Sequence, residues 1–293
     1  MTGSNRSLAD GGDGRDHDYD DHAPLTDVFD LVGHETRTAI VATLGEYDRT
    51  ESDGSGLSFS TLRERVGHDD PGNFNYHLQR LVGGPVEKTD AGYTLSRVGH
   101  RLLAVVVSDR FDPETDTDLR ATTDCPVCGD SAPVRYTDGC LEVECSTHSA
   151  TLDVGSAFVD RVGVSRAYAT GYWDGVLDCS SFRRGICRLC EGRTDGGLVE
   201  RGDGVRFEAI CRQCGHRITH VPAGCVLDHP AVVALCWDHD VDVREDAARL
   251  TADHADSEVV QTDPLRVDVR VTVGDDSVVV TLDDDATVCG VVE

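Results

Sequence analysis

The sequence predicts an α+β protein, in which a helical N-terminal region is followed by small β units built around cysteines. Three observations support this fold class. Apolar residues recur at helical spacing between residues 25 and 107, and four pairs of potential metal ligands with two-residue gaps follow residue 120. Valines then alternate with polar residues from 265 to 292. At 293 residues, the chain is long enough for two or three domains.

The charge balance is strongly acidic, because 54 acids face 27 bases and the formal net charge is −27. Lys88 is the only lysine. Such a field repels nucleic acid in dilute salt, but the Debye length falls to about 3 Å in molar salt. The Lys-poor, Asp-rich composition resembles that of haloarchaeal proteins, and this resemblance implies an archaeal, halophilic source. An acidic mesophilic protein is the alternative.

Residues 1–23 are rich in Gly, Asp and His, and we expect a disordered acidic tail. We find no apolar window long enough for a membrane span and no apolar core of a signal peptide at the start. The predicted location is therefore the cytoplasm. The reducing conditions there favour metal sites over disulfides for the 12 cysteines.

Residues 24–110 read as a DNA-binding domain of helices and one hairpin. An apolar pattern over 25–47 is interrupted at Gly33, and a loop covers 48–56. The predicted elements that follow are a helix over 58–67, a helix over 70–83 capped by Asp70 with Pro71 at its first position, a hairpin over 83–95 and a helix over 96–107. This order is that of a winged helix-turn-helix.

The segment "DPGNFNYHLQRL", residues 70–81, is predicted to be an amphipathic helix that reads DNA. Phe74, Leu78 and Leu81 fall on its apolar side. The polar side carries Asn73, Tyr76, Gln79 and Arg80, with Asn75 and His77 on the flanks. Asn and Gln can pair with adenine and Arg with guanine. Residues 60–101 hold six bases against five acids, so the acid excess disappears where DNA would dock.

The stretches "LVGHETRTAIVATL", "FNYHLQRL" and "GYTLSRVGHRLL" resemble ArsR-like winged helix regulators. The resemblance implies that the protein is a homodimer. It also implies that six residues of the third helix face the major groove: Asn73, Asn75, Tyr76, His77, Gln79 and Arg80. We take Lys88, in the predicted hairpin, as a further DNA contact. Metal-sensing members of that family carry a cysteine cluster in this domain. Residues 24–110 contain no cysteine, so metal sensing is not expected there.

The next region, residues 121–150, has the pattern of a zinc ribbon. Cys125 and Cys128 form one knuckle, and Cys145 and His148 form another at the same spacing. Between them lies a predicted hairpin with a turn at residues 137–139. A two-residue gap lets both side chains of a pair reach one tetrahedral ion, and thiolate with imidazole suits Zn²⁺. Cys140 has the wrong spacing, and we leave its binding of metal open.

The pattern repeats over residues 187–221, where the predicted ligands are Cys187, Cys190, Cys211 and Cys214. Because each ribbon has four candidate ligands, we expect about two structural Zn²⁺ ions per chain rather than a catalytic metal. Redox-active dithiols are the alternative. A third set is formed by Cys225, His229, Cys236 and His239. We favour a core thiol and a surface histidine here, and leave metal binding open for Cys225, Cys236 and His239.

The remaining segments are predicted to be a helical connector over 151–186, and a helix plus a C-terminal β-meander over 222–293. The connector helix covers 156–182, a second helix starts at Asp228, and the meander turns at residues 274–276 and 283–285. This half resembles the C-terminal region attached to many haloarchaeal winged helix proteins. We expect it to serve dimerisation or to bind a small-molecule or protein effector.

The sequence thus predicts a DNA-binding transcription regulator, with duplex DNA as its partner and no membrane partner. The alternative is an interaction module similar to general transcription factors, which contacts the transcription machinery without operator specificity. We find no nucleophile–base pair, phosphate-binding loop or open metal site in the sequence, so an enzyme is not expected.

Overall fold

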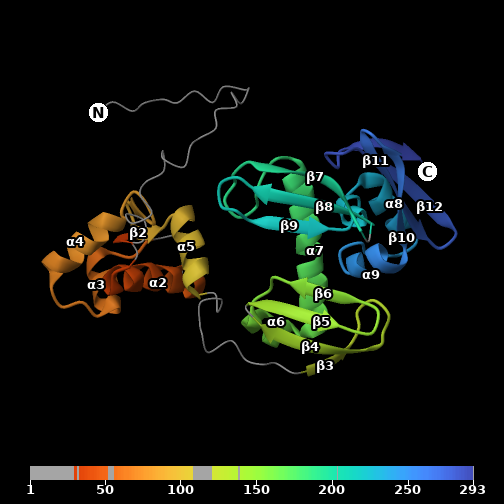
Figure 1. Ribbon diagram of the computed structural model, residues 1–293. Coiled ribbons are helices and arrows are strands. Elements are labelled where there is room, and N and C mark those ends of the chain that lie inside the picture. Colours follow the sequence, from red (N-terminus) through yellow and green to blue (C-terminus); the bar gives the residue numbers. More distant parts are fainter. Residues whose placement is uncertain are drawn as a thin grey trace. The chain divides into compact units, whose positions relative to one another are not determined.

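The computed structural model describes residues 30–31, 33–51, 56–107, 121–137, 139–202 and 204–292. Within these residues the fold is α+β, with helices and four small antiparallel sheets (Figure 1). The chain divides into two compact units, Met1–Val107 and Ser108–Glu293. Among the described helices, none has both the length and the apolar character that crossing a bilayer requires. The acidic tail predicted for residues 1–23 lies outside the described residues.

The first unit has the predicted order of helices and hairpin. Its elements are α2 (Glu35–Thr50), α3 (Phe59–Val66), α4 (Pro71–Leu81), β1 (Val86–Thr89), β2 (Gly92–Leu95) and α5 (Arg97–Val107). The side chain of Ser58 caps the start of α3, and Gly67 ends it in the left-handed conformation. Asp70 caps α4 by accepting from the amides of the second and third residues that follow it.

Every element of the first unit contributes to one core. Helix α4 supplies Phe74, Leu78 and Leu81, which are fully buried and whose spacings of four and three residues place them on one face. Their buried neighbours come from α2, α3, the hairpin and the residue that bridges to it: Ile40, Val41, Leu44, Tyr47, Leu57, Leu62, Val86, Tyr93 and Leu95. The opposite face of α4 is therefore directed away from this core.

The second unit contains two small sheets that each carry one group of cysteines. The first has the strand order β3–β4–β5–β6 and the second β7–β8–β9. Their strands are β3 (Ala121–Asp124), β4 (Ser131–Thr137), β5 (Cys140–Glu144), β6 (Ser149–Leu152), β7 (Thr194–Arg201), β8 (Gly204–Cys211) and β9 (Arg217–His220). The hairpin predicted inside the first cysteine region is thus the pair β4–β5, which turns at Gly139.

Helices join and cover these sheets. The connector, predicted as one helix over 156–182, consists of two helices, α6 (Ser156–Val162) and α7 (Val164–Arg183), which are separated at Gly163. Helix α7 runs from one sheet to the other (Figure 1). After β9 follow the 3-10 helix η4 (Pro222–Cys225) and the helices α8 (Pro230–Asp238) and α9 (Ala247–Asp253). Helix α8 is capped by His229, one residue later than the predicted start.

The C-terminal sheet confirms the predicted meander and adds a strand. Its strands are β10 (Ala255–Thr262), β11 (Leu265–Val273), β12 (Asp276–Leu282) and β13 (Val288–Val292), in that order. The added strand, β10, was not predicted from the sequence. This strand lies at the edge of the sheet and is exposed over most of its length, so no buried face imposes an alternation on its residues.

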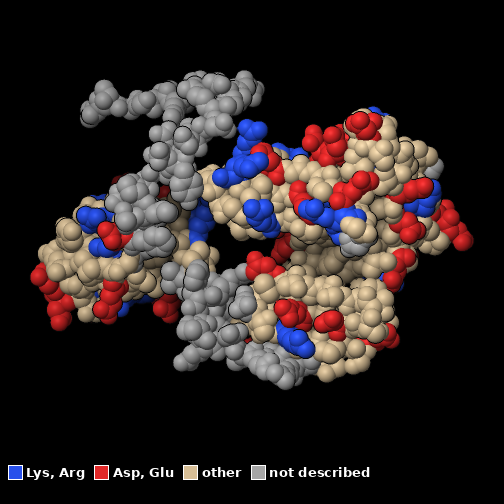
Figure 2. Space-filling view, viewed as in Figure 1, with Lys and Arg blue, Asp and Glu red and all other residues tan. Residues whose placement is uncertain are grey.

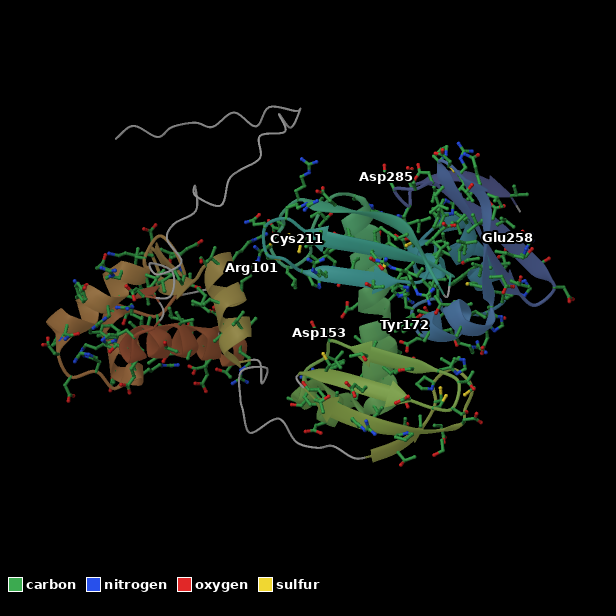
Figure 3. All side chains as sticks on the ribbon, in the orientation of Figure 1. Arg101, Asp153, Tyr172, Cys211, Glu258 and Asp285 are labelled. Atoms are coloured by element: carbon green, nitrogen blue, oxygen red, sulfur yellow. The ribbon has the colours of Figure 1, made fainter. Side chains whose placement is uncertain are left out.

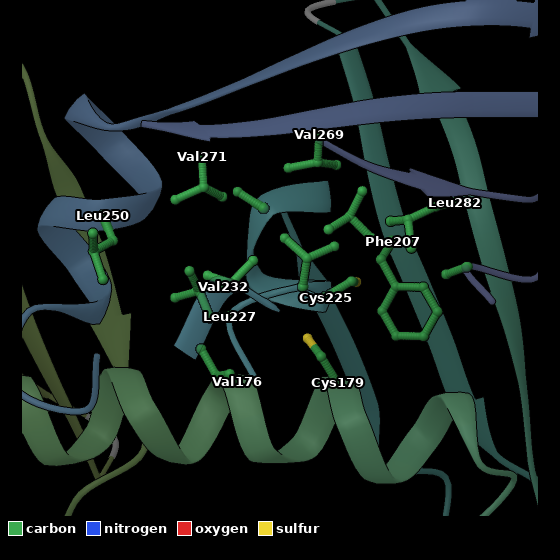
Figure 4. Close-up of a cluster of buried hydrophobic side chains, with 14 of the residues drawn as sticks. Val176, Cys179, Phe207, Cys225, Leu227, Val232, Leu250, Val269, Val271 and Leu282 are labelled. Atoms are coloured by element: carbon green, nitrogen blue, oxygen red, sulfur yellow. The ribbon is translucent and has the colours of Figure 1, made fainter. Parts of the chain in front are cut away.

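One core connects α7, the second sheet and the C-terminal sheet (Figure 4). In the close-up, Val176 and Cys179 project from α7 towards Cys225 and Leu227, and Phe207 of β8 lies beside them. The C-terminal sheet contributes its alternating inward valines and leucine: Val267, Val269, Val271, Val278, Val280 and Leu282. The second sheet therefore packs one of its faces on a core that it shares with α7 and the C-terminal elements, whereas the first sheet has a separate core.

Candidate metal centres and nucleic-acid interface

The three Cys-x2-Cys knuckles are tight turns closed by the residue that follows each pair. Gly129, Glu191 and Gly215 each follow a Cys-x2-Cys pair and have φ values of 77°, 63° and 76°. Each of their amides donates to the carbonyl of the first cysteine in its pair, at 2.9, 2.8 and 3.1 Å respectively. This closed turn directs both thiols of a pair to the same side. Glycine adopts the left-handed conformation without a steric penalty, which explains why it follows two of these pairs.

The second cluster consists of Cys187, Cys190, Cys211 and Cys214, as the sequence predicts. Their sulfur atoms all lie within 4.8 Å of one another. Cys187 Sγ and Cys214 Sγ are 3.8 Å apart, and Cys190 Sγ and Cys211 Sγ are 3.5 Å apart. Four thiolates with this separation can surround a single ion. Figure 3 places Cys211 at one end of the β7–β9 sheet.

The first cluster consists of Cys125, Cys128, Cys145 and His148, again as predicted, with ligand atoms within 4.8 Å of one another. Cys128 Sγ and Cys145 Sγ are 3.7 Å apart. His148 turns its Nδ1 towards the group, at 3.9 Å from Cys125 Sγ and 3.7 Å from Cys145 Sγ. Its Nε2 is thus left for a neighbour outside the cluster.

The donor sets and spacings fit a tetrahedral ion of the size of Zn²⁺. A Zn–S bond of about 2.3 Å corresponds to a separation of about 3.8 Å between two thiolate ligands, which is close to the values above. A disulfide requires sulfurs only about 2.05 Å apart, and all 12 cysteines are free thiols. The residues can therefore hold two metal ions, each with four protein ligands and no position left open.

Backbone amides favour the thiolate form in both clusters. The amides of Thr147 and His148 point at Cys145 Sγ from 3.4 and 3.1 Å and lower the pKa of this thiol to about 6. In the second cluster, burial of Cys211 raises its pKa. The amides two and three residues further along the chain outweigh this effect, and the pKa of Cys211 falls to about 7. Since only the thiolate binds metal, these amides prepare the clusters for an ion.

Two polar side chains next to the clusters were missed by sequence reasoning. Asp253, at the end of α9, has a carboxylate oxygen 3.8 Å from His148 Nε2. His216 has its Nδ1 4.0 Å from Cys187 Sγ and its ring against that of Phe182. The only sequence signal for His216 is its position two residues after a ligand. Asp253 lies more than one hundred residues from His148 in the chain, so only the fold brings it near.

The thiols and histidine whose metal binding was left open lie outside both clusters. Cys225 and Cys236 are buried in the core of the second unit, as predicted for core thiols. His239 Nε2 is 2.9 Å from a carboxylate oxygen of Asp276. Cys140 is half-buried at the start of β5. Among the described residues, the groups suited to a metal are the two four-residue clusters.

Helix α4 presents a polar surface opposite to its buried apolar face. Tyr76 is 57% exposed, although a tyrosine ring that contributes to a core would be covered. The amides of Asn75 and Gln79, one helical turn apart, lie 3.5 Å from each other. The exposed residues of the predicted DNA contacts are Asn73, Asn75, Tyr76, Gln79, Arg80 and, in the hairpin, Lys88.

The prediction that His77 belongs to this surface is wrong. His77 is only 5% exposed, and its ring lies 4.0 Å from that of His34. Its Nδ1 is 3.3 Å from Nη1 of Arg37. Because arginine can only donate, the imidazole accepts here and is neutral. A position on the flank of an isolated helix becomes buried once α2 lies against it.

Arg37 is a buried side chain of α2 that links two parts of the first unit. Its Nε donates to the carbonyl of Leu31 at 2.5 Å, and its Nη2 donates to that of Asp30. Burial, followed by the charges of His34 and Arg37, lowers the pKa of His77. The contact between Arg37 and His77 therefore orients α4 on α2 by hydrogen bonding, in addition to the apolar packing between the two helices.

Comparison with known proteins assigns each unit to a family model. Residues 122–288 match the model of a family described as a domain of unknown function (DUF7351). Residues 25–106 match a second model, also described as a domain of unknown function (DUF7347). No curated protein and no solved structure matches the chain. The two matches correspond closely to the two compact units of the fold.

Proposed function

We propose that this chain, which belongs to the family described as a domain of unknown function (DUF7351), is a DNA-binding transcription regulator. In this proposal, residues 24–110 form an ArsR-like winged helix-turn-helix, with α4 in the major groove and β1–β2 as the wing. The two cysteine-bearing sheets are zinc ribbons. They stabilise a C-terminal half that serves homodimerisation or effector binding in the cytoplasm.

The observation that supports this proposal is the division of α4 into two faces. Phe74, Leu78 and Leu81 are fully buried, so the helix is held rigidly in its unit. Five polar side chains of the types that read base edges remain on the other side. A good bidentate contact between such a side chain and a base contributes about 1–3 kcal/mol of discrimination. A few of them are therefore sufficient for sequence selectivity.

The structural role proposed for zinc follows from the small size of the sheets. The core of the first sheet is made mainly of small and medium apolar side chains from short strands. A structural Zn²⁺ contributes about 10–16 kcal/mol of apparent binding free energy to the folded state. This is as large as the total stability of a typical domain, about 5–15 kcal/mol. The ion is then a condition for folding rather than an addition to it.

The proposal is tested by selecting binding sites from a random-sequence duplex library in high salt. We expect an enriched motif, and we expect Gln79→Ala to reduce the preference for that motif by about 5–150-fold, the equivalent of 1–3 kcal/mol. The matched control is Gln261→Ala, the same substitution in the second unit, which should leave the preference unchanged. Failure of the unmodified protein to enrich any motif would refute operator recognition.

A second candidate function is favoured by one observation in the second unit. Trp237 of α8 is 80% exposed. Together with Trp173 and Val233 it lines a surface cavity of about 600 Å³. Exposed tryptophans are frequent anchors of protein interfaces, so this surface supports the alternative of a module that contacts the transcription machinery. Loss of polymerase binding in Trp237→Ala, with no selective DNA binding by the unmodified protein, would favour this candidate.

A further inference from the structure

The second cysteine-bearing segment is basic, unlike the chain as a whole. Residues 183–217 hold eight arginines and five acids, although the whole chain has a net charge of −27. The corresponding segment around the first cluster, residues 121–153, holds one arginine and six acids. The two segments have similar knuckles and antiparallel strands, so the difference in charge does not follow from the fold that they share.

Five of the eight arginines of this segment lie on one face of the β7–β9 sheet. Along β8, the residues Val205, Phe207 and Ala209 are buried in the core, and the residues between them point to the other side. The strand register places Val199 opposite Arg206 and Ile210 opposite Arg217. The outer face therefore carries five bases and two acids: Arg193, Arg201, Arg206, Arg212, Arg217, Asp195 and Glu208.

On this face, five guanidinium groups stand against two carboxylates. Arg193 and Arg212 share the single carboxylate of Asp195, at 3.4 and 2.5 Å, and their side chains are 68% and 62% exposed. Exposed ion pairs of this kind are weak, because water and salt screen the attraction between the charges. Either guanidinium can therefore exchange the carboxylate for another anion at little cost.

The sheet of the first cluster offers an internal comparison. Its outer face carries one base, Arg135, and three acids, Asp124, Glu142 and Glu144. Figure 2 shows this contrast, because blue side chains gather over β7, β8 and β9 whereas red ones predominate over β4 and β5. We call the outer face of β7–β9 the basic face. It ends at β7, where the carbonyl oxygen of Asp284 lies beside Gly197, so that the acidic loop containing Asp284 is close to the strand.

We infer that the outer face of β7–β9 is a second nucleic-acid contact, which binds the phosphate backbone of duplex DNA. A guanidinium donates to two phosphate oxygens in one plane, a geometry that lysine does not offer. No aromatic side chain occurs at the described positions of this outer face, so it has no platform on which unpaired bases could stack. The choice of duplex DNA as the polyanion rests on the proposed function, whereas the face itself lies outside the predicted reading helix.

This contact has a measurable consequence for salt dependence. The predicted reading domain is nearly neutral between residues 60 and 101, so few counterions are released when it binds. Each phosphate contact adds about 0.9 to the slope of log K against log salt on B-form DNA. The basic face should therefore account for most of the salt dependence of the full chain.

The test uses the full-length, zinc-loaded chain and a random-sequence duplex, with binding followed by fluorescence anisotropy over a range of potassium chloride concentrations. The variant is Arg193→Gln/Arg212→Gln/Arg217→Gln. We expect the slope to become smaller by about 2.7, which corresponds to three lost phosphate contacts. The matched control changes the same net charge elsewhere in the second unit, as Arg135→Gln/Arg244→Gln/Arg270→Gln, and should retain the original slope.

Further results test the inference. The triple substitution to lysine at the same positions keeps the charge and should keep most of the slope. Equal losses in the basic-face variant and the matched control, or no duplex binding by the unmodified chain, would overturn the inference. Single-stranded DNA that competes better than duplex would also overturn it. Loss of motif selection alone, with a slope that still depends on the three arginines, would refute operator recognition but not this contact.

Discussion

Replacing Arg37 by leucine should loosen the predicted reading helix without altering its exposed surface. The guanidinium donates to the carbonyls of Asp30 and Leu31 and to His77 Nδ1. After substitution, the two carbonyls lie near the surface of the unit and can turn to water. The imidazole of His77 is buried, so its Nδ1 cannot turn to water. One unsatisfied buried acceptor costs about 1–3 kcal/mol. We therefore expect the free energy of unfolding of the first unit to fall by this amount.

The assay is urea denaturation of the full chain, followed by a probe within the first unit, together with thermal melting. For a unit of this size, each kcal/mol corresponds to a shift in Tm of about 4–8 °C. The matched control is Arg49→Leu, on the same helix, whose side chain is exposed and lies 4.0 Å from Glu46. A cost for Arg37→Leu no greater than that for Arg49→Leu would refute the proposed anchoring.

The same contact predicts a dependence on pH. Since burial lowers the pKa of His77 in the folded state below its ordinary value of 6.5, the unfolded chain takes up a proton first as pH falls. The stabilisation is complete above pH 6.5 and is lost as pH falls through the folded pKa. In Arg37→Leu, the adjacent positive charge is gone, and the pKa of His77 should rise. NMR titration of the His77 ring measures both values, and an unchanged pKa would contradict this account.

Three further predictions concern the core and the metal clusters. Leu78→Ala should lower the free energy of unfolding of the first unit by about 2–5 kcal/mol in urea denaturation, because the side chain is fully buried. Cys190→Ser should reduce the metal content from about two ions per chain to about one in elemental analysis, whereas Cys140→Ser should leave it unchanged. Asp253→Asn should weaken metal binding at the first cluster by about 10–100-fold in competition with a chelator, if the carboxylate orients His148; unaltered affinity would exclude that role.

Features with a short-range signal could be predicted from the sequence. The apolar spacing of Phe74, Leu78 and Leu81 requires only the period of a helix, and the structure buries all three. All four knuckles have a two-residue gap, and three of them are followed by a residue in the left-handed conformation. The eight proposed ligands are grouped as predicted. The valine alternation of β11 and β12 reports a sheet with one buried face.

Features that depend on a distant partner could not be predicted. His77 has the sequence context of a flanking surface residue, and only the approach of Arg37 from α2 makes it a buried acceptor. The amino-acid counts contained the arginine excess of residues 183–217, but strand pairing is needed to place Arg206 and Arg217 on one face.

Sequence by itself therefore determined which residues have an apolar side, which carry metal-binding chemistry and where strands alternate, because these are properties of neighbouring residues. Tertiary structure alone decided which side of each element is covered. Covering depends on contacts between segments far apart in the chain, such as that of Asp253 with His148. For the same reason, the polar face of α4 is a sequence property, whereas the loss of His77 from that face results from the packing of α2.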